Sequence, residues 1–339
     1  MIPQDFLQQR AKDLDITLRQ IVSTVPDDVP GLGVMLRYPL GWVDQNDRPY
    51  GRPTGKRIRP LLLLLCAESA DGDWHKALPA AAAIELLHNF SLVHDDIQDN
   101  SPTRHGRPTV WKIWGRSNAV NVGDALFSLA HVALEKLSET GISADTVLEV
   151  WHIFNQTTLK LTRGQHLDMR FESQAHVTID DYLAMIEGKS AALLSASAQI
   201  GVMIAINDKD AAFHYAEFAL NLGMAFQIRD DILGIWGDPN VTGKSAATDI
   251  LARKKSLPIL YGLSKSEELV AIYANEVIQE TDVERAAEIL DRVGAEDYVL
   301  EEEARYSRLA TEFLEAADPK GEAATQLLKL VDDLLMRNR

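Results

Sequence analysis

The sequence predicts an all-α fold, a single-domain helical bundle around a central cavity. Apolar residues recur at helical spacing along most of the chain, as in the stripe formed by Ile84, Leu87 and Phe90. Long segments are rich in Ala and Leu, which favour helix over strand. No series of Val/Ile/Thr runs separated by Asn-Gly or Asp-Gly turns is present, so a sheet core is not expected.

The helices follow from this periodicity and from the breakers between periodic segments, such as Asp71-Gly72 and Ser101-Pro102. Thr178 and Asp181 have the form of a capping box, with Asp in place of Glu, at the start of one helix. The segment 31–54 has several Gly and Pro residues and little periodicity, so we expect an irregular loop. No linker divides residues 1–339 into separate domains. In chain order, we expect helices at 3–25, 56–70, 78–100, 119–139, 143–171, 178–206, 208–236, 246–264, 267–276, 282–293, 296–316 and 321–337.

The composition narrows the classes of function. Lys and Arg together number 34 and Asp and Glu 50, so the formal net charge is −16, which argues against nucleic-acid or anionic-membrane binding. The single cysteine, Cys66, excludes an intrachain disulfide and indicates a reducing compartment. The longest apolar runs, 61–67 and 78–84, are far shorter than the ~20 residues of a membrane span. We therefore expect a soluble, cytoplasmic protein without a signal peptide or membrane span.

An Asp-Asp pair on an apolar helix occurs twice in the sequence. Asp95 and Asp99 are four positions apart, so they share one helix face, and Asp96 lies beside them. Such close carboxylates repel one another unless cations or hydrogen bonds compensate, and hard oxygen donors suit Mg²⁺. Asp230 and Asp231 are expected to form the second wall of the site. A solvated acidic helix end would explain one such motif, but two motifs on apolar helices favour a metal site.

Basic residues accompany both acidic motifs in the sequence. Arg side chains bind phosphate oxygens with paired hydrogen bonds, and Lys supplies a point charge. Together with Mg²⁺-type carboxylates, these residues indicate a ligand with several phosphates. No GxxxxGK[ST] loop is present, so nucleotide triphosphate chemistry of that kind is not expected. The basic residues are Lys56, Arg57, Arg59, Arg104, His105, Arg107, Lys189, Lys244, Arg253, Lys254 and Lys255.

In order and spacing, these motifs resemble those of the trans-isoprenyl diphosphate synthases, the polyprenyl synthetase family. Residues 55–60, GKRIRP, resemble the GKxxRP element of the family, and residues 85–99 resemble the helix that carries its first aspartate-rich motif. Lys189-Ser190 falls where the family has Lys-Thr. Residues 226–258 resemble the second motif and its tail. The resemblance implies an all-α bundle of the isoprenoid synthase type and a homodimer.

The resemblance also implies the reaction. Isopentenyl diphosphate would condense head-to-tail with an allylic diphosphate (dimethylallyl, geranyl or farnesyl) to give a short-chain all-trans prenyl diphosphate. About three Mg²⁺ ions would bridge the allylic diphosphate to the protein and stabilise the charge that develops on it. An apolar cavity would shield the allylic cation from water. No enzyme nucleophile is needed, and Cys66 is expected in the core.

Site residues follow from the resemblance, position by position. The metal would be bound by Asp95, Asp99 and Asp230, with Asp96 and Asp231 in support. The allylic diphosphate would be bound by Arg104, Lys189, Gln227 and Lys244, and isopentenyl diphosphate by Lys56, Arg59 and His88. His105, Ser190 and Lys254 complete the expected substrate-binding set.

The sequence departs from the family pattern at two site positions. Where the family has Arg-Arg-Gly after the first motif, this chain has Arg104-His105-Gly106, so His105 or Arg107 would replace the second Arg. The second DDxxD motif ends at Gly234, which removes one carboxylate. The loop 31–54 also looks longer than is usual in the family.

Product length depends on the residues before Asp95. Phe90 lies five positions before it, ~7.5 Å down the helix axis, and the small Ser91 lies four positions before it. This arrangement resembles short-chain members that stop at geranylgeranyl diphosphate (C20), although core packing alone also explains an aromatic residue at this position. Farnesyl (C15) and farnesylgeranyl (C25) diphosphate are the alternative products.

Three other functions share features with this sequence. A class I terpene cyclase would carry an Asn/Ser/Glu metal triad in place of Asp230-Asp231 and would lack the GKxxRP element. His94-Asp95 suggests an HD-type phosphohydrolase, but that function leaves the basic residues unexplained. A silent regulatory subunit of a heteromeric prenyltransferase would usually lose the first acidic motif, whereas all of its aspartates are present here.

Overall fold

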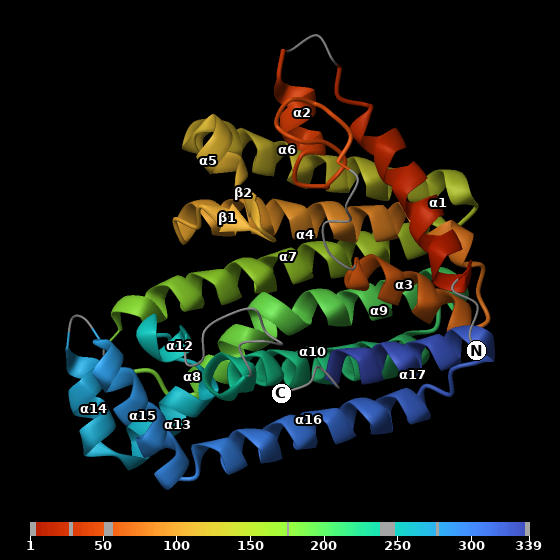
Figure 1. Ribbon diagram of the computed structural model, residues 1–339. Coiled ribbons are helices and arrows are strands. Elements are labelled where there is room, and N and C mark those ends of the chain that lie inside the picture. Colours follow the sequence, from red (N-terminus) through yellow and green to blue (C-terminus); the bar gives the residue numbers. More distant parts are fainter. Residues whose placement is uncertain are drawn as a thin grey trace. The chain divides into compact units, whose positions relative to one another are not determined.

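The computed structural model describes residues 5–26, 30–50, 57–174, 176–237, 248–275 and 278–335, and they are predominantly helical (Figure 1). Within these ranges the strands are limited to β1 (Thr103–Arg104) and β2 (Arg107–Pro108), which pair in an antiparallel hairpin. An isolated bridge joins Val43 and Pro49. The predicted all-α class is confirmed.

The chain divides into two compact units. Unit 1 contains Met1–Thr158, Ala196–Phe213 and Pro319–Ala324. Unit 2 contains Leu159–Ser195, His214–Asp318 and Thr325–Arg339. Four described helices begin in one unit and end in the other: α7 (Ala144–Ser173), α9 (Ala192–Ile206), α10 (Lys209–Trp236) and α17 (Gly321–Leu335). The single domain expected for residues 1–339 stays a prediction.

Unit 1 is built around α4 (Leu78–Gln98), which packs along α6 (Arg116–Glu135). The helix α4 begins with a Pro in its first turn, where the missing N–H costs no hydrogen bond. The two helices approach closely at Gly123, where a Cβ atom would lie 2.1 Å from Nε2 of His94. The other helices of this unit are α1 (Asp5–Val22), α2 (Leu32–Arg37), α3 (Ile58–Ser69) and α5 (Val110–Trp114), with 3₁₀ turns at Trp74–Ala77 and Lys136–Thr140.

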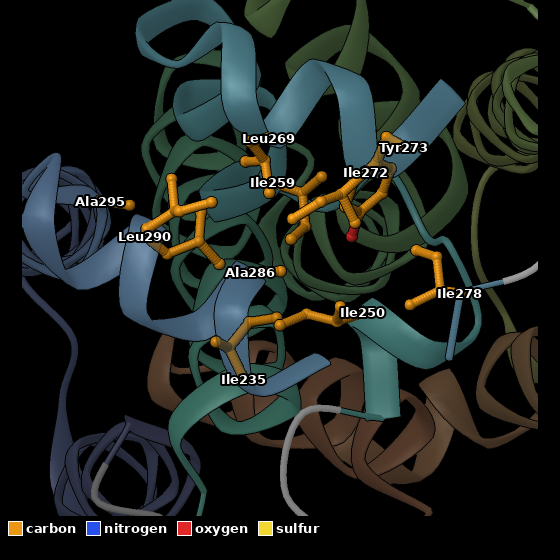
Figure 2. Packing of buried hydrophobic residues seen from close by; sticks show 11 residues of the cluster. Ile235, Ile250, Ile259, Leu269, Ile272, Tyr273, Ile278, Ala286, Leu290 and Ala295 are labelled. Carbon is orange, nitrogen blue, oxygen red and sulfur yellow. The ribbon is translucent and has the colours of Figure 1, made fainter. Parts of the chain in front are cut away.

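Unit 2 contains α8 (Ile179–Ile186), which begins with the predicted capping box, since Thr178 and Asp181 each accept the other's backbone N–H. A π-helical turn, Glu187–Ala191, joins α8 to α9. Figure 2 shows a buried cluster to which α10 contributes Ile235 and α13 contributes Ile259. The remaining helices are α12 (Thr248–Leu251), α13 (Leu257–Lys265), α14 (Glu267–Ala274), α15 (Glu280–Arg292), α16 (Ala295–Ala316) and α17 (Gly321–Leu335).

Two segments differ from the sequence-based expectation. The described part of the irregular loop expected at 31–54, residues 31–50, begins with the short helix α2 and continues in turns, whereas residues 51–54 lie outside the described residues. The described part of the single helix expected at 246–264 is divided between α12 and α13, because the φ of Arg253, 54°, lies in the left-handed region. A helix cannot continue through a residue in that conformation.

One stretch of the described chain, Ile179–Ile206, is long and apolar enough to cross a membrane by length and composition. Within its most apolar window, 67% of the residues are buried inside the protein. The core helix of a folded protein meets the same criteria, so this stretch is weak evidence for a membrane span.

Candidate active site

The first acidic motif lies at the C-terminal end of α4. Asp99 caps the helix, and its N–H donates to the carbonyl of Asp95 at 2.8 Å. Arg104, from β1, turns back over this end: its Nη2 lies 2.8 Å from Oδ2 of Asp95, and its Nε lies 2.8 Å from Oδ1 of Asp96. One guanidinium therefore bridges two neighbouring carboxylates.

Asp96 is the more deeply buried member of this pair, with 4% of its surface exposed. Burial raises the pKa of Asp96 to about 6, although the ion pair with Arg104 acts in the opposite direction. Asp95 is more accessible, with 16% of its side chain exposed. This difference fits the expectation that Asp95 binds a ligand directly while Asp96 supports it.

Two of the residues expected to bind isopentenyl diphosphate, Arg59 and His88, meet within unit 1. Nη1 of Arg59 lies 3.2 Å from Nε2 of His88. Burial lowers the pKa of His88 well below its usual value, and the nearby charges of Arg59, Arg104 and His105 lower it further, so this imidazole is neutral. The buried Nε of Arg59 has no hydrogen-bond partner among the described residues, which leaves a donor available for an anion.

Arg107 has a different position from His105. Its guanidinium lies between the rings of Tyr38 and Tyr50, 4.0 Å from each centroid. It also donates to the carbonyl oxygens of Tyr38 at 3.3 Å and Val43 at 2.8 Å. These contacts fasten the segment 38–50 to β2. Of the two candidates for the missing second Arg, His105 is the one whose charge acts on His88.

The second acidic motif lies on α10, in unit 2. Asp231 is fully buried, and its Oδ2 accepts from the hydroxyl of Tyr182 and from the N–H of Leu257 at 3.1 Å. Its Oδ1 accepts from Nε2 of Gln227 at 3.4 Å. Burial raises the pKa of Asp231 to about 6. These contacts fit the expectation that Asp231 supports the site, and the assignment of metal ligands stays a prediction.

The π-helical turn after α8 brings Lys189 and Ser190 to this acidic motif. Nζ of Lys189 forms an ion pair with Asp168 of α7, and the hydroxyl of Ser190 donates to Oε1 of Gln227 at 2.8 Å. The backbones approach closely here, since a Cβ at Gly164 would lie 2.2 Å from the N atom of Lys189. Asp168 was missed in the sequence because it belongs to no acidic pair.

Lys254 is a cation of unit 2 that is influenced by several nearby carboxylates. Its Nζ lies 3.6 Å from Oδ2 of Asp249, and its side chain is half-exposed. Burial acts to lower the pKa of Lys254, but the charges of surrounding aspartates outweigh it and raise this pKa. These aspartates are Asp231, Asp249, Asp168 and Asp230. Asp249 is a second residue that the sequence did not indicate.

Two expected site residues, Lys56 and Lys244, lie outside the described residues. The chain-length candidates are described. Phe90 is half-buried and faces α6, with its ring centroid 5.1 Å from that of Phe127 and 4.8 Å from that of His94. The hydroxyl of Ser91 donates to the carbonyl of His88 at 2.8 Å.

Within the described ranges, no group of three or more His, Cys, Asp or Glu side chains is arranged to hold a metal ion. The donor set nevertheless fits Mg²⁺, since it offers carboxylate oxygens without thiolates. In unit 1, Arg104 already supplies positive charge to two of these carboxylates, and Lys189 and Lys254 do so in unit 2. Each cluster is therefore built to be neutralised by cations.

Comparison with known proteins decides between the candidate functions. A model of the polyprenyl synthetase family matches residues 42–290. The chain belongs to this family. As a polyprenyl synthetase, it is 39% identical over 290 residues to a geranylgeranyl diphosphate synthase from Saccharolobus solfataricus, covering 84% of this chain and 87% of the relative. It is also 39% identical over 272 residues to a (2E,6E)-farnesyl diphosphate synthase from Mycobacterium tuberculosis, covering 80% of this chain and 74% of the relative.

Solved structures agree with this assignment. A polyprenyl synthetase from Streptomyces coelicolor matches with a TM-score of 0.86 and 31% identity, covering 97% of this chain and 98% of that one. A geranylgeranyl pyrophosphate synthetase from Pyrococcus horikoshii matches with a TM-score of 0.85 and 32% identity, covering 98% and 97%. The family resemblance and the enzyme class, a prenyltransferase, are confirmed. The terpene cyclase, phosphohydrolase and silent-subunit alternatives are correspondingly disfavoured.

Proposed function

We propose that this polyprenyl synthetase condenses isopentenyl diphosphate with dimethylallyl, geranyl and farnesyl diphosphates and releases geranylgeranyl diphosphate. The observation that carries the proposal is the pairing of Arg104 with Asp95 and Asp96 beside the contact between Arg59 and His88. A site with carboxylates for a metal and cations for phosphate suits a diphosphate leaving group. Family membership supports the same reaction.

In this proposal, Asp95, Asp99 and Asp230 would hold Mg²⁺, with Asp96 and Asp231 fixing their surroundings. When bound, Mg²⁺ supplies Lewis-acid stabilisation of the charge that grows on the departing diphosphate. The protein cations that bind this diphosphate are Arg104, Lys189, Lys244 and Lys254, and Gln227 adds a hydrogen bond.

Isopentenyl diphosphate would be bound by Lys56 and Arg59, with His88 and His105 beside them. Because His88 is neutral, it does not repel the positive charge of Arg59, and it can donate one N–H to a phosphate oxygen. The C–O bond of the allylic diphosphate breaks and the double bond of isopentenyl diphosphate attacks the allylic carbon. The proton then lost from isopentenyl diphosphate passes to the departing diphosphate, so no protein base is required.

The C20 product is supported by Phe90, which lies on the helix that carries Asp95 and packs its ring 5.1 Å from that of Phe127. The relatives include farnesyl, geranylgeranyl and geranylfarnesyl diphosphate synthases, so the neighbouring lengths C15 and C25 are the alternatives. We also propose a homodimer in the cytoplasm. Family membership supports the homodimer.

The proposal is tested by incubating the protein with labelled isopentenyl diphosphate and each allylic starter in turn, followed by product sizing. Parallel reactions contain Mg²⁺ or a chelator. We expect a C20 product from each starter with Mg²⁺ and none with the chelator. Failure to form any prenyl product with Mg²⁺ present contradicts the function, whereas a C15 or C25 product contradicts only the length.

A further inference from the structure

Gly234 leaves a space on α10 that the carboxylate of Asp249 occupies. A Cβ atom built at Gly234 would lie 2.6 Å from Oδ2 of Asp249, 2.7 Å from its Cγ and 3.0 Å from its Oδ1. All three atoms belong to one carboxylate, so that group rests on the bare backbone of Gly234. Any other side chain at position 234 would displace it. Position 234 lacks the last carboxylate of the second DDxxD motif, and the carboxylate of Asp249, on α12, lies beside this position instead.

The Asp249 carboxylate depends on Lys254 for compensation. Its Oδ2 is buried and has no hydrogen-bond partner among the described residues. A buried carboxylate oxygen without a hydrogen bond is unfavourable unless a cation lies nearby. Nζ of Lys254 lies 3.6 Å from this oxygen. Asp249 therefore restricts where the flexible Lys254 side chain can place its ammonium group.

The backbone around this pair is anchored on both sides. Ile235 and Ile250, which follow Gly234 and Asp249 in sequence, belong to the same buried cluster (Figure 2). Beyond α12, Arg253 adopts a left-handed conformation with φ of 54° and donates to the carbonyl of Tyr273 at 2.7 Å. Nζ of Lys255 donates to the carbonyl of Phe171 at 2.7 Å. With both neighbours of Lys254 fixed in this way, Asp249 sets the direction of its side chain.

We propose that Asp249, seated on Gly234, is a positioning residue that takes the place of the missing motif carboxylate and directs Lys254 toward the diphosphate. This inference rests on the proposed function, in which Lys254 binds the allylic diphosphate. Gly234 is then a requirement of this chain, and restoring the usual Asp at that position would harm the enzyme. Asp168, Asp230 and Asp231 also act on Lys254, so Asp249 orients a cation that the cluster already attracts.

The decisive variant is Gly234→Ala. Alanine is the better helix former, so α10 is expected to keep its stability while the new Cβ displaces the Asp249 carboxylate. Calorimetry measures the binding of inorganic pyrophosphate in the presence of MgCl₂. We expect binding to weaken about tenfold, with an unchanged helical circular dichroism signal, because one oriented cation is lost. Steady-state assays are expected to show a higher KM for the allylic diphosphate with a smaller change in kcat.

A double-mutant cycle distinguishes positioning from a general structural effect. If Asp249 acts through Lys254, Gly234→Ala adds little to Lys254→Ala, and Asp249→Asn resembles Gly234→Ala. Asp297→Asn, at an exposed carboxylate on α16, serves as the matched control and is expected to bind pyrophosphate like the wild type. Full additivity, or binding by Gly234→Ala within about twofold of the wild type, overturns the proposal. These binding measurements remain interpretable even if the wild type forms no prenyl product, so the two proposals fail separately.

Discussion

Arg104 donates to Asp95 across 2.8 Å, and both residues belong to the set expected to bind the diphosphate and its metal. The cation thus pairs with the carboxylate that Mg²⁺ is expected to bind. Binding of a metal diphosphate would exchange this contact for two others, from the carboxylate to the metal and from the guanidinium to phosphate. Arg104 is placed to offset part of the negative charge at the acidic end of α4 in the absence of ligand.

Replacing a carboxylate of either acidic motif is expected to abolish turnover. For Asp95→Ala and Asp230→Ala we expect a loss of several powers of ten in the rate of prenyl transfer, at ~1.4 kcal/mol per factor of ten. The rate is measured with labelled isopentenyl diphosphate, and circular dichroism confirms that each variant is folded. Asp297→Asn is the control for loss of a carboxylate elsewhere. Near-normal activity of either variant with Mg²⁺ would contradict the proposed metal ligands.

Phe90 is expected to limit the length of the prenyl product. Phe90→Ala removes the ring that packs against Phe127, which leaves space for a longer chain, so products beyond C20 are expected. Chromatography of the labelled products measures their length. Phe313→Ala, at a half-buried aromatic of α16, controls for the general loss of an aromatic side chain. An unchanged product distribution for Phe90→Ala would show that another residue sets the length.

The hydrogen bond between Tyr182 and Asp231 predicts a pH-dependent change in stability. Asp231 has a folded pKa of about 6, above its unfolded value of 3.8, so its ionisation lowers the free energy of unfolding as pH rises between these values. Tyr182→Phe removes a donor to the ionised form and raises the folded pKa further. We expect a loss of about 1–3 kcal/mol above pH 6 and a smaller loss as pH falls toward 4.

Urea unfolding of both proteins at several pH values measures this difference. Tyr273→Phe is a suitable control, because the Tyr273 hydroxyl is buried without a hydrogen-bond partner in the described chain. A difference between wild type and Tyr182→Phe that is constant across pH would mean that Asp231 does not ionise as proposed.

Arg107 and His105 are expected to have separable effects. Arg107→Ala removes the stacking between Tyr38 and Tyr50, so we expect easier proteolysis within residues 38–50 and about 1–2 kcal/mol less stability. His105→Ala leaves that segment in place and is expected to raise the KM for isopentenyl diphosphate severalfold. Limited proteolysis and steady-state kinetics measure the two effects. The reverse pattern would make Arg107 the replacement for the missing Arg.

Much of the fold was predictable because helical periodicity is a local property. The capping box at Thr178 and the long helices α4, α7 and α10 all follow from neighbours in sequence. The division between α12 and α13 was not predictable, because it depends on the left-handed conformation of Arg253. That residue type does not signal a helix end, and its contact with Tyr273 is between distant parts of the sequence.

The residues of the candidate site also fall into two groups, those that the sequence indicated and those that it did not. The paired aspartates, Arg59, His88 and Arg104 were indicated by spacing and by family motifs. Asp168 and Asp249 were not, because each is a single acidic residue until folding places it beside a lysine. The role of Arg107 was equally hidden, since a cation between two aromatic rings requires residues that are distant in sequence.

The close approach of α4 and α6 at Gly123 has a practical consequence for protein engineering. Because even a methyl group there would collide with the ring of His94, substitution at this position would displace that ring, which also contacts Phe90. A mutant library designed to alter product size should therefore keep Gly123 fixed and randomise positions 90 and 127. In such a library the His94 ring keeps its place beside Gly123, and each change in chain length can be ascribed to the side chains that were varied.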